Sequence, residues 1–427
     1  MATIRPFQGL RFTPDAGPLA ELVAPPYDVV TPEQREALAE KNKHNVVHVT
    51  LPKSEDGERS KFVKYTRSAA IVEEWRRQGI VAPEDQPAFY RYRQRFTVPG
   101  SGQTYERTTL VALIKVEPYE NGVVLPHEQT FPKHKTDRLR LLEATRSHLE
   151  CIYGLIEDMN EVVYKTLIDA PAELVGTVPT DHEGIEHDFE RITDASSITT
   201  LIELLEPKKV WIADGHHRYE TALAFKESNK AGDDDPESYM MMAFSSISDP
   251  GLVLLPTHRI LKDLPVEPDE LKSRFEEFFK VEDAPNEELL KKLKDRRSGE
   301  VAAFGVALKG GQGFFAYTDK KDELADRVEV EGSQDLRRLD VNILHGFIFS
   351  KLLGLTGTDF FGYSRNPDDA LASVEDDAAA AILMNPPTVD DMRQVALGGE
   401  RMPQKSTFYY PKLLSGLVMW QLKDFEG

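Results

Sequence analysis

Hydrophobic and polar positions follow two different periods along the first part of the chain. Residues 60–78 place apolar side chains at helical spacing, which predicts an amphipathic helix. Residues 89–98 and 108–117 instead have the pattern of an antiparallel strand pair joined through a glycine-containing turn. The β-branched run at 45–51 predicts a further strand. The helix is expected to bury Phe62, Tyr65, Ala69, Val72 and Trp75.

A short apolar run, a glycine turn and a second helical period mark the centre of the chain. Residues 210–213 predict a buried strand, 214–217 a turn and 218–226 a helix. Before this segment, residues 133–146 are densely basic, and most of them are expected to form a helix over 137–145. This strand–turn–helix is the most clearly patterned segment of the sequence.

From about residue 266 the hydrophobic pattern starts again. Residues 300–317 predict a hairpin, and residues 335–353 predict one strong amphipathic helix. Thr388 and Asp391 resemble a capping box at the start of a helix over 389–397. The chain closes with an aromatic run and a final strand through its last tryptophan.

Strands and helices mix without strict alternation, which favours an α+β, or mixed α/β, fold. At about 150 residues per domain, 427 residues correspond to roughly three regions. We expect an N-terminal α+β region at 1–105 and a central core at 106–265. A C-terminal α+β region at 266–427 is expected to contribute to the same cleft.

Composition narrows the classes of function. The chain carries 52 Lys plus Arg against 72 Asp plus Glu, a formal charge of −20, which disfavours nucleic acid as a partner. Its one cysteine excludes internal disulfides and zinc sites built from several thiolates, and a cytoplasmic location is expected. No apolar run approaches the ~18 residues of a membrane span. None of this indicates an oligomeric state.

The turn that begins at Asp214 has the chemistry of an anion site. A helix N-terminus presents free backbone N–H groups, and Gly215 permits close approach of a phosphate. Arg218 adds donors suited to phosphate oxygens, as do His216 and His217, of which one is expected to face the ligand. Asp214 would hold Mg2+ or accept a hydroxyl proton. The alternative is that Asp214 only caps the helix.

His127 and Glu128 precede the basic segment and form a second candidate group. Glu128 would act as a base near an acceptor hydroxyl, while Lys135 and Arg138 would neutralise phosphate charge. The alternatives are a surface loop with a solvated basic helix face, or a hydrolytic zinc site at His127, Glu128 and His134. The spacing of those histidines differs from that of a zinc-protease helix.

Weaker candidates lie elsewhere in the chain. His258 and Arg259 follow a predicted strand and would contact substrate, or else pack as structural residues. Tyr27 and Asp28 lie in a proline-stiffened loop that would face the same cleft, or form a structural turn. Lys405 and Ser406 loosely resemble a phosphate-binding loop, without the spacing of a P-loop.

Several of these segments resemble known families. IADGHHRY at residues 212–219 is similar to the turn that holds nucleotide phosphates in the ParB/sulfiredoxin-like superfamily, and is closest to its free L-serine kinases. This resemblance implies that the core at 106–265 is a ParB/serine-kinase-like nucleotide-binding core. The whole chain also resembles the bacterial and archaeal domain-of-unknown-function family 1015. The segments that carry this second resemblance are APPYDV at 24–29, LPHEQT at 125–130, KTDRLRLL at 135–142, IADGHHRYETAL at 212–223, DPGLVLLPTHR at 249–259 and PQKSTFYYPKL at 403–413.

Departures from the superfamily pattern narrow what the resemblance implies. Sulfiredoxins need a cysteine after the turn glycine, where this chain has His216, and its one thiol is Cys151. ParB-like partition proteins carry a more arginine-rich turn and a helix-turn-helix domain, and this sequence shows neither. What remains is nucleotide binding with phosphoryl transfer to a small molecule, with L-serine as the implied acceptor.

The sequence therefore favours an ATP- or ADP-dependent small-molecule kinase with Mg2+ as cofactor. Asp214, Glu128 and His127 are the expected catalytic residues, and Asp214 is also the expected metal ligand. A nucleotide-binding switch that hydrolyses slowly and changes conformation is the second hypothesis. A metal-dependent hydrolase built on His127, Glu128 and the paired histidines is the third.

Overall fold

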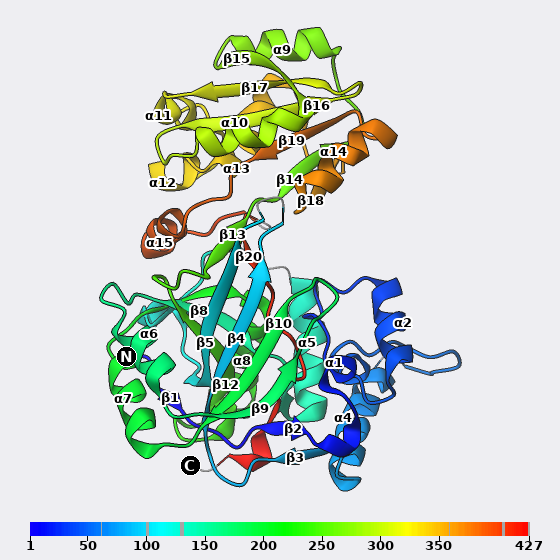
Figure 1. Ribbon diagram of the computed structural model, residues 1–427, viewed down its shortest axis with the longest axis vertical. Helices are drawn as coiled ribbons and strands as arrows, with labels where there is room; N and C mark the ends of the chain where they lie inside the picture. Colours follow the sequence, from blue (N-terminus) through cyan, green and yellow to red (C-terminus); the bar gives the residue numbers. More distant parts are fainter. Residues whose placement is uncertain (61, 100–101, 129–131, 358, 404–405, 426–427) are drawn as a thin grey trace.

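The computed structural model shows two units stacked along the long axis of the molecule (Figure 1). Of the residues that the structure describes, those within 1–257 and 402–425 form the large unit, and those within 258–401 form the small unit. For residues 132–134 the structure describes the backbone alone. The described residues are 1–60, 62–99, 102–128, 132–357, 359–403 and 406–425.

A nine-stranded mixed sheet forms the core of the large unit. The strand order is β6-β11-β8-β12-β5-β4-β10-β9, and β1 also pairs with β5. The predicted pair around residue 100 is confirmed, because β4 and β5 pair in antiparallel register. The strands are β1 (Ile4–Arg5), β4 (Phe89–Thr97), β5 (Thr104–Lys115), β6 (Val124–Leu125), β8 (Ile152–Ile156), β9 (Glu173–Val178), β10 (Glu186–Ile192), β11 (Val210–Asp214) and β12 (Tyr239–Ser246).

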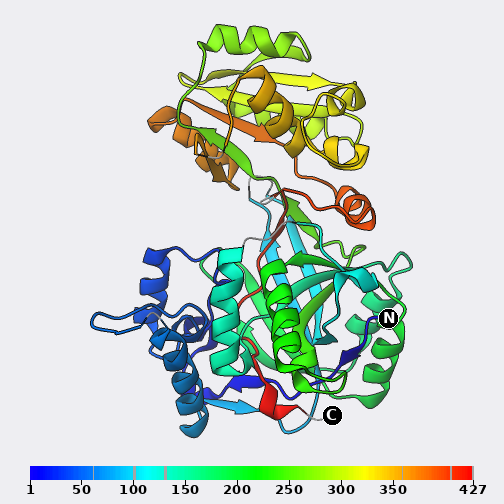
Figure 2. The ribbon, with the colours of Figure 1, turned by 180° about the vertical axis from the view of Figure 1, so that it is seen from behind.

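Helices cover this sheet and tie its N-terminal part to its centre. Helix α5 (Pro132–Thr145) packs between α8 (His216–Asn229) and α4 (Val63–Arg77), and the first two lie side by side (Figure 2). Helices α6 (Val162–Asp169) and α7 (Ala195–Leu205) pack on each other elsewhere on the sheet. No helix in the described part of the chain is long and apolar enough to cross a membrane.

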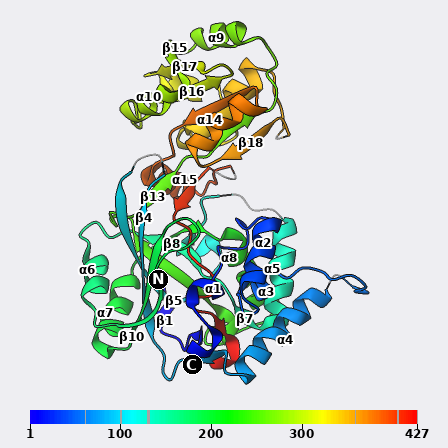
Figure 3. The ribbon, with the colours of Figure 1, turned by 45° about the vertical axis from the view of Figure 1, so that its right-hand side comes forward.

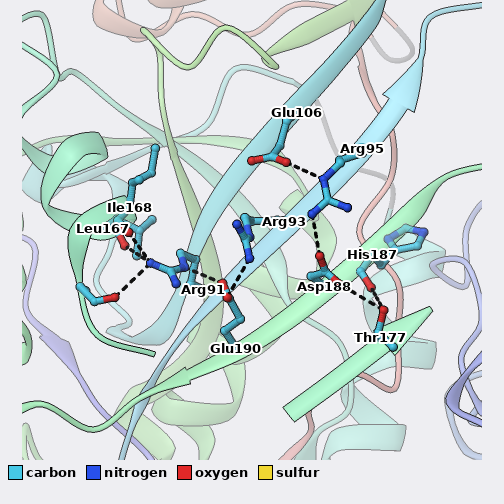
Figure 4. Close-up of polar contacts among 11 residues, drawn as sticks. Arg91, Arg93, Arg95, Glu106, Leu167, Ile168, Thr177, His187, Asp188 and Glu190 are labelled. Carbon is cyan, nitrogen blue, oxygen red and sulfur yellow. Dashed lines mark hydrogen bonds and ion pairs between the residues drawn. The ribbon is translucent and has the colours of Figure 1, made fainter. Parts of the chain in front are cut away.

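Three arginines on one face of β4 bind the neighbouring elements together (Figure 4). Arg91 is buried, pairs with Glu190 of β10 and donates to the carbonyl oxygen of Leu167 in α6. Arg93 also pairs with Glu190, and Arg95 pairs with acidic groups on both flanking strands. Because a buried charge is costly without a partner, the contacts of Arg91 fix α6 against the sheet, and those of Arg93 and Arg95 join the neighbouring strands.

The strand predicted at residues 45–51 is wrong. Val47–Thr50 form a short helix, α3, which packs against α4. Val46, Val47 and Val49 are buried in the same apolar cluster as Trp75. Burial of these β-branched side chains against a neighbouring helix outweighs their preference for strands.

The small unit is built on a six-stranded antiparallel sheet. Its predicted hairpin is confirmed by β16 and β17, which pair in antiparallel register. Helices α10 (Leu289–Asp295) and α14 (Pro367–Asp376) pack on this sheet. The strand order is β15 (Lys280–Pro285), β17 (Gln312–Thr318), β16 (Ala302–Leu308), β19 (Ala380–Met384), β14 (His258–Leu261) and β18 (Phe361–Ser364).

The helix predicted over 335–353 is broken into pieces. Helix α12 (Gln334–Arg337) stops before Leu339, whose backbone is extended, and α13 (Asp340–Ile343) then runs into a π-helical segment, Leu344–Leu352. The apolar face persists across the break, with Leu339, Ile343 and Phe347 all buried. The capping box at Thr388 is confirmed at the start of α15 (Val389–Leu397).

Two paired strands connect the units. Strand β13 (Val253–Leu255) leads up to the small unit, β20 (Phe408–Tyr410) follows the return, and they pair antiparallel with Leu255 opposite Phe408. The mixed α+β class is confirmed by the whole arrangement. The three-region division stays a prediction: pairing of β4 with β5 crosses residue 105, and the last residues return to the large unit.

Candidate functional site

The turn after β11 has the geometry of an anion cradle. The ladder between β11 and β8 is irregular beside Ala213, a feature that redirects the residues that follow. Gly215 has a φ of 93°, and a Cβ there would lie 2.7 Å from Ile152 Cγ2. Gly215 is also the N-cap of α8. It has no side chain, so no capping side chain accepts a hydrogen bond from the first backbone N–H groups of the helix. Asp214 therefore does not cap this helix.

Asp214 lies between two cations. Its Oδ1 is 3.1 Å from Lys412 Nζ and its Oδ2 is 3.3 Å from Arg218 Nη2. Burial alone would raise the pKa of Asp214, but Lys412 and Arg218 outweigh burial and hold the pKa below its usual value. A carboxylate in this state is a weak proton acceptor, and its clearest role is to position the two cations.

Arg218 is fixed by contacts on several sides. Its Nη1 donates to the carbonyl oxygen of Cys151 at 2.5 Å. Burial would lower the pKa of this guanidinium, but Glu150 and Asp214 raise it above its usual value. The ring of Tyr27 lies under two guanidinium groups, 4.1 Å from that of Arg138 and 6.0 Å from that of Arg218. The Tyr27 ring thus lies against the guanidinium groups of both Arg138 and Arg218 beside the turn.

A cleft of about 850 Å³ opens over this turn, and residues of both units line it. Sequence-predicted residues gathered there are Tyr27, Asp28, Glu128, Arg138, Asp214, Gly215, His216, His217 and Arg218. The small unit supplies Tyr363, Ser364, Arg365, Asn366 and Asp369 from β18 and the start of α14. Both elements lie on the side of the small unit that faces the large one (Figure 3). Residues of both units therefore line the cleft, while the three-region division itself stays a prediction.

His127 is buried behind the cleft rather than in its lining. Its Nδ1 lies 2.5 Å from the Ile212 carbonyl oxygen, so Nδ1 carries the proton and Nε2 accepts from the Thr407 hydroxyl at 2.9 Å. Burial lowers the pKa of His127 to about 4. A neutral His127 thus orients Thr407, which lines the cleft. Its predicted catalytic role stays a prediction, and its contacts favour positioning.

The two histidines of the turn differ in their surroundings. His216 is buried, and its Nε2 accepts the backbone N–H of His127 at 3.3 Å. Burial lowers the pKa of His216 well below its usual value, so the ring is neutral. His217 is less buried, and both histidines line the cleft. His217 is accordingly the better candidate for contact with a ligand.

Other predicted residues lie outside the cleft lining. Lys135 forms an ion pair with Glu220 of α8, and the Ser406 hydroxyl donates to the Pro403 carbonyl oxygen at 2.6 Å. Lys405 lies outside the described residues. His258 lines a neighbouring cavity, whereas Arg259 is buried with its guanidinium 5.0 Å from the ring centre of Tyr363. Roles for these residues at a ligand stay predictions.

Two cations in the cleft were not singled out from the sequence. Lys412 lies within the PQKSTFYYPKL segment, so that motif held a signal for it. Arg365 stands in YSRNP, which carries no recognised motif, and the fold alone brings it to the cleft. Its guanidinium lies 3.8 Å from the ring centre of Phe408, and the described residues form no ion pair with it.

A magnesium ion was expected at Asp214, and the contacts there do not fit that role. Both of its oxygens already face cations. Among the described residues, no group of three or more His, Cys, Asp or Glu side chains is placed to hold a metal. We therefore assign no step to a protein-held metal, and the zinc hydrolase hypothesis gains no support from the described residues.

The structure defines a mixed α+β protein with an uncapped strand–turn–helix facing a charged cleft. The chain belongs to the family described as protein of unknown function, DUF1015, whose family model matches residues 4–342. The predicted family resemblance is thus confirmed. No curated protein matches the chain.

Solved structures that resemble this chain do so distantly. A conserved hypothetical protein from Pyrococcus furiosus is 13% identical with a TM-score of 0.33, and the match covers 74% of this chain and 97% of that chain. A free serine kinase in complex with AMP is 13% identical with a TM-score of 0.36, covering 74% and 93%. A variant of free serine kinase in complex with ADP is 12% identical with a TM-score of 0.37, covering 77% and 95%.

Proposed function

We propose that the protein is a nucleotide-dependent small-molecule kinase. One observation carries the proposal: the N-terminus of α8, which no side chain caps, opens into a cleft whose lining holds four cations beside five acidic side chains. Backbone N–H groups and guanidinium forks together suit the phosphates of ATP or ADP. The cations are Arg138, Arg218, Arg365 and Lys412.

In the proposed reaction an acceptor hydroxyl oxygen attacks the terminal phosphorus of the nucleotide. A bond forms between that oxygen and phosphorus as the bond from phosphorus to the bridging oxygen breaks, and the shortened nucleotide leaves with the electron pair. Glu128, which lines the cleft, takes the hydroxyl proton. Asp214 is held ionised between two cations and keeps Arg218 and Lys412 on the phosphates.

The proposal extends to the acceptor and the cofactor. L-serine is the first acceptor to test, because the DGHHR turn resembles that of free L-serine kinases. Mg2+ would enter with the nucleotide, bound mainly by its phosphates. The remaining partner is a small molecule, and we place the reaction in the cytoplasm in keeping with the single cysteine.

A nucleotide-binding switch is the second candidate, and one observation favours it. Arg365 comes from the small unit while the turn belongs to the large unit, so a bound nucleotide would draw the two units together. Hydrolysis that no acceptor stimulates would support the switch. Acceptor-dependent consumption of nucleotide would support the kinase.

Thermal unfolding with ATP, ADP and CTP, each with and without Mg2+, tests nucleotide binding directly. We expect a rise in Tm with ATP or ADP, and no rise with any of them would overturn both candidates. Arg218→Ala should weaken binding by about tenfold or more, because it removes a charged fork from the phosphates. Arg338→Ala is the matched control, since Arg338 pairs with Glu300 away from the cleft.

Consumption of ATP and ADP should then be measured against a panel of amino and hydroxy acids, with L-serine first. An acceptor that raises consumption and appears as its phosphate ester identifies the reaction. If purified protein binds nucleotide but no acceptor raises consumption above basal hydrolysis, the kinase proposal fails and the switch stands.

A further inference from the structure

A second cavity of about 660 Å³ lies beside the cleft, between the two units. The large unit contributes Val98, Pro99, Gln103 and Tyr105 of the β4–β5 hairpin, and residues 252–256 around β13. The small unit contributes α10 and the loop between β19 and α15. A volume of this size accommodates a molecule much larger than L-serine, whose side chain is a single hydroxymethyl group.

The lining of this second cavity is apolar with basic groups. Leucine, valine, proline and methionine side chains form most of it, including Leu254, Leu293 and Pro387. Lys294, Arg297 and Arg365 also line it, and no acidic side chain of the described residues does. On a chain of formal charge −20, a cavity with three cations and no acid favours an anionic ligand.

His258 adds a buried donor to the same cavity. Its Nδ1 accepts the backbone N–H of Met384 at 3.3 Å, so in the neutral ring Nε2 carries the proton. Burial lowers the pKa of His258 to about 4, which keeps the ring neutral. In the described structure Nε2 is buried without a hydrogen-bond partner. The His258 side chain is fully buried, so this donor borders the second cavity without being exposed to it.

The second cavity meets the cleft at two places in the chain. Arg365 lines both, and Pro256 lines the second cavity while the next residue, Thr257, lines the cleft. A ligand in the second cavity and a phosphate chain in the cleft would therefore approach each other at the Arg365 guanidinium. That is the position a kinase needs for its acceptor hydroxyl.

We propose that the second cavity binds an organic acid with an apolar body and a hydroxyl group. The carboxylate would lie near Arg297, and the hydroxyl would point toward Arg365. Its role as acceptor rests on the proposed kinase function, and in that reaction the acid's hydroxyl oxygen becomes the ester oxygen of the product. Binding of the acid itself does not depend on the nucleotide.

Isothermal titration of the full chain without nucleotide tests the binding. The probes are ω-hydroxydecanoate, the neutral decanediol and L-serine. We expect the hydroxy acid to bind at least about tenfold more tightly than either of the others, because charge-assisted hydrogen bonds and apolar contacts both act on it. Equal binding of the neutral diol, or no binding of the acid, would overturn the proposal.

Two variants locate the site. Arg297→Glu reverses an exposed charge, and Leu254→Trp fills the cavity from β13. Each should weaken binding of the hydroxy acid by about tenfold or more, while nucleotide affinity changes less than about twofold. Their controls are Lys309→Glu and Leu397→Trp, exposed positions outside both cavities. Unchanged acid affinity in both test variants would overturn the assignment.

The two proposals fail separately. Nucleotide binding without acid binding would overturn the second cavity's assignment alone. Acid binding without nucleotide binding would overturn the kinase and leave the cavity assignment standing. If both ligands bind, formation of ω-phosphonooxydecanoate decides the acceptor role, and its absence would overturn that role.

Discussion

The two units line the same cleft, but their charged side chains differ in whether they form ion pairs. In the large unit, Asp214 and Arg218 pair with each other, Lys412 pairs with Asp214, and Arg218 also donates to a backbone carbonyl. In the small unit, Arg365 stacks on Phe408 with no ion pair among the described residues. Burial lowers the pKa of Arg365, although Asp28 and Asp214 counteract part of that effect.

This difference separates two functions of a binding site. Groups that already hold their partners are preorganised and lose little when a ligand arrives. A half-buried cation without an ion pair stays available for negative charge that develops on the phosphate during transfer. The large unit is therefore expected to set the ground-state affinity for nucleotide, and the small unit to stabilise the charge that develops in the reaction.

The largest effect should come from Gly215→Ala. The added Cβ meets Ile152 at 2.7 Å on a backbone with a φ of 93°, so the turn must shift. We expect about 2 kcal/mol loss of stability and at least ~100-fold loss of nucleotide affinity. Urea unfolding and titration calorimetry measure the two effects. The control is Gly299→Ala, which meets nothing within 4 Å, and equal effects of the two changes would refute the preorganised turn.

Arg365→Ala should affect turnover more than binding. We expect turnover to fall about 100-fold while nucleotide affinity falls less than about tenfold, because Arg365 acts on charge that develops during transfer. Stability should not fall, since an unpaired half-buried cation is removed. Steady-state kinetics and thermal unfolding check this. If Arg365→Ala lowered the Tm as much as Arg218→Ala does, Arg365 would be as firmly held as Arg218, which would contradict the difference between the units.

Acid should destabilise both units through buried histidines. Burial lowers the pKa of His148 in the large unit to about 4 and that of His345 in the small unit to about 3. Their folded pKa values lie below the unfolded value near 6.5, so the unfolded chain binds protons that the folded chain refuses. The contribution of these neutral histidines to the free energy of unfolding is complete above pH ~6.5 and is lost as the pH falls toward 4.

Tryptophan fluorescence can isolate this acid response, because all three tryptophans lie in the large unit. Urea unfolding followed by fluorescence should lose about 2 kcal/mol per such histidine between pH 7 and 5. His148→Phe keeps an aromatic ring stacked on Trp420. This variant should lose about 2 kcal/mol less unfolding free energy between pH 7 and 5 than the unchanged protein, as followed by fluorescence. An unchanged pH slope in this variant would contradict a neutral His148.

The smallest effect should come from Arg393→Ala. This side chain of α15 pairs with Glu157 of the large unit at 2.6 Å, and both groups are partly exposed. Such pairs contribute less than about 1 kcal/mol, so the midpoint of unfolding should hardly move. A shift worth more than about 2 kcal/mol would show that the units are locked together.

The local sequence pattern was sufficient to predict secondary structure where the strand, turn and helix are consecutive in the chain. The strand, turn and helix around Gly215 could be predicted because a glycine and a change of period stand together in the sequence. The short helix at 47–50 could not, since its valines are buried by a helix that follows later in the chain. Tertiary packing, not local preference, decides that segment.

The residues of the site were predictable to the extent that they lie in a motif. Tyr27, Glu128 and Arg138 reach the cleft from separate segments that the sequence had marked. Arg365 could not be found in this way, because only the return of β18 toward the large unit brings it there. The buried contacts of His127 were equally invisible, since its partners lie 85 and 280 residues away.

The pairing of β13 with β20 makes the small unit an insertion into an otherwise continuous large unit. Leu255 and Phe408 are directly opposite each other, so a tight turn could join them as an ordinary hairpin. Domains grafted at such neighbouring ends can be lost, lengthened or replaced without rethreading the host sheet. The Gly215 turn of the large unit and the small unit can therefore diverge independently in sequence, although residues of both units line the cleft and the second cavity.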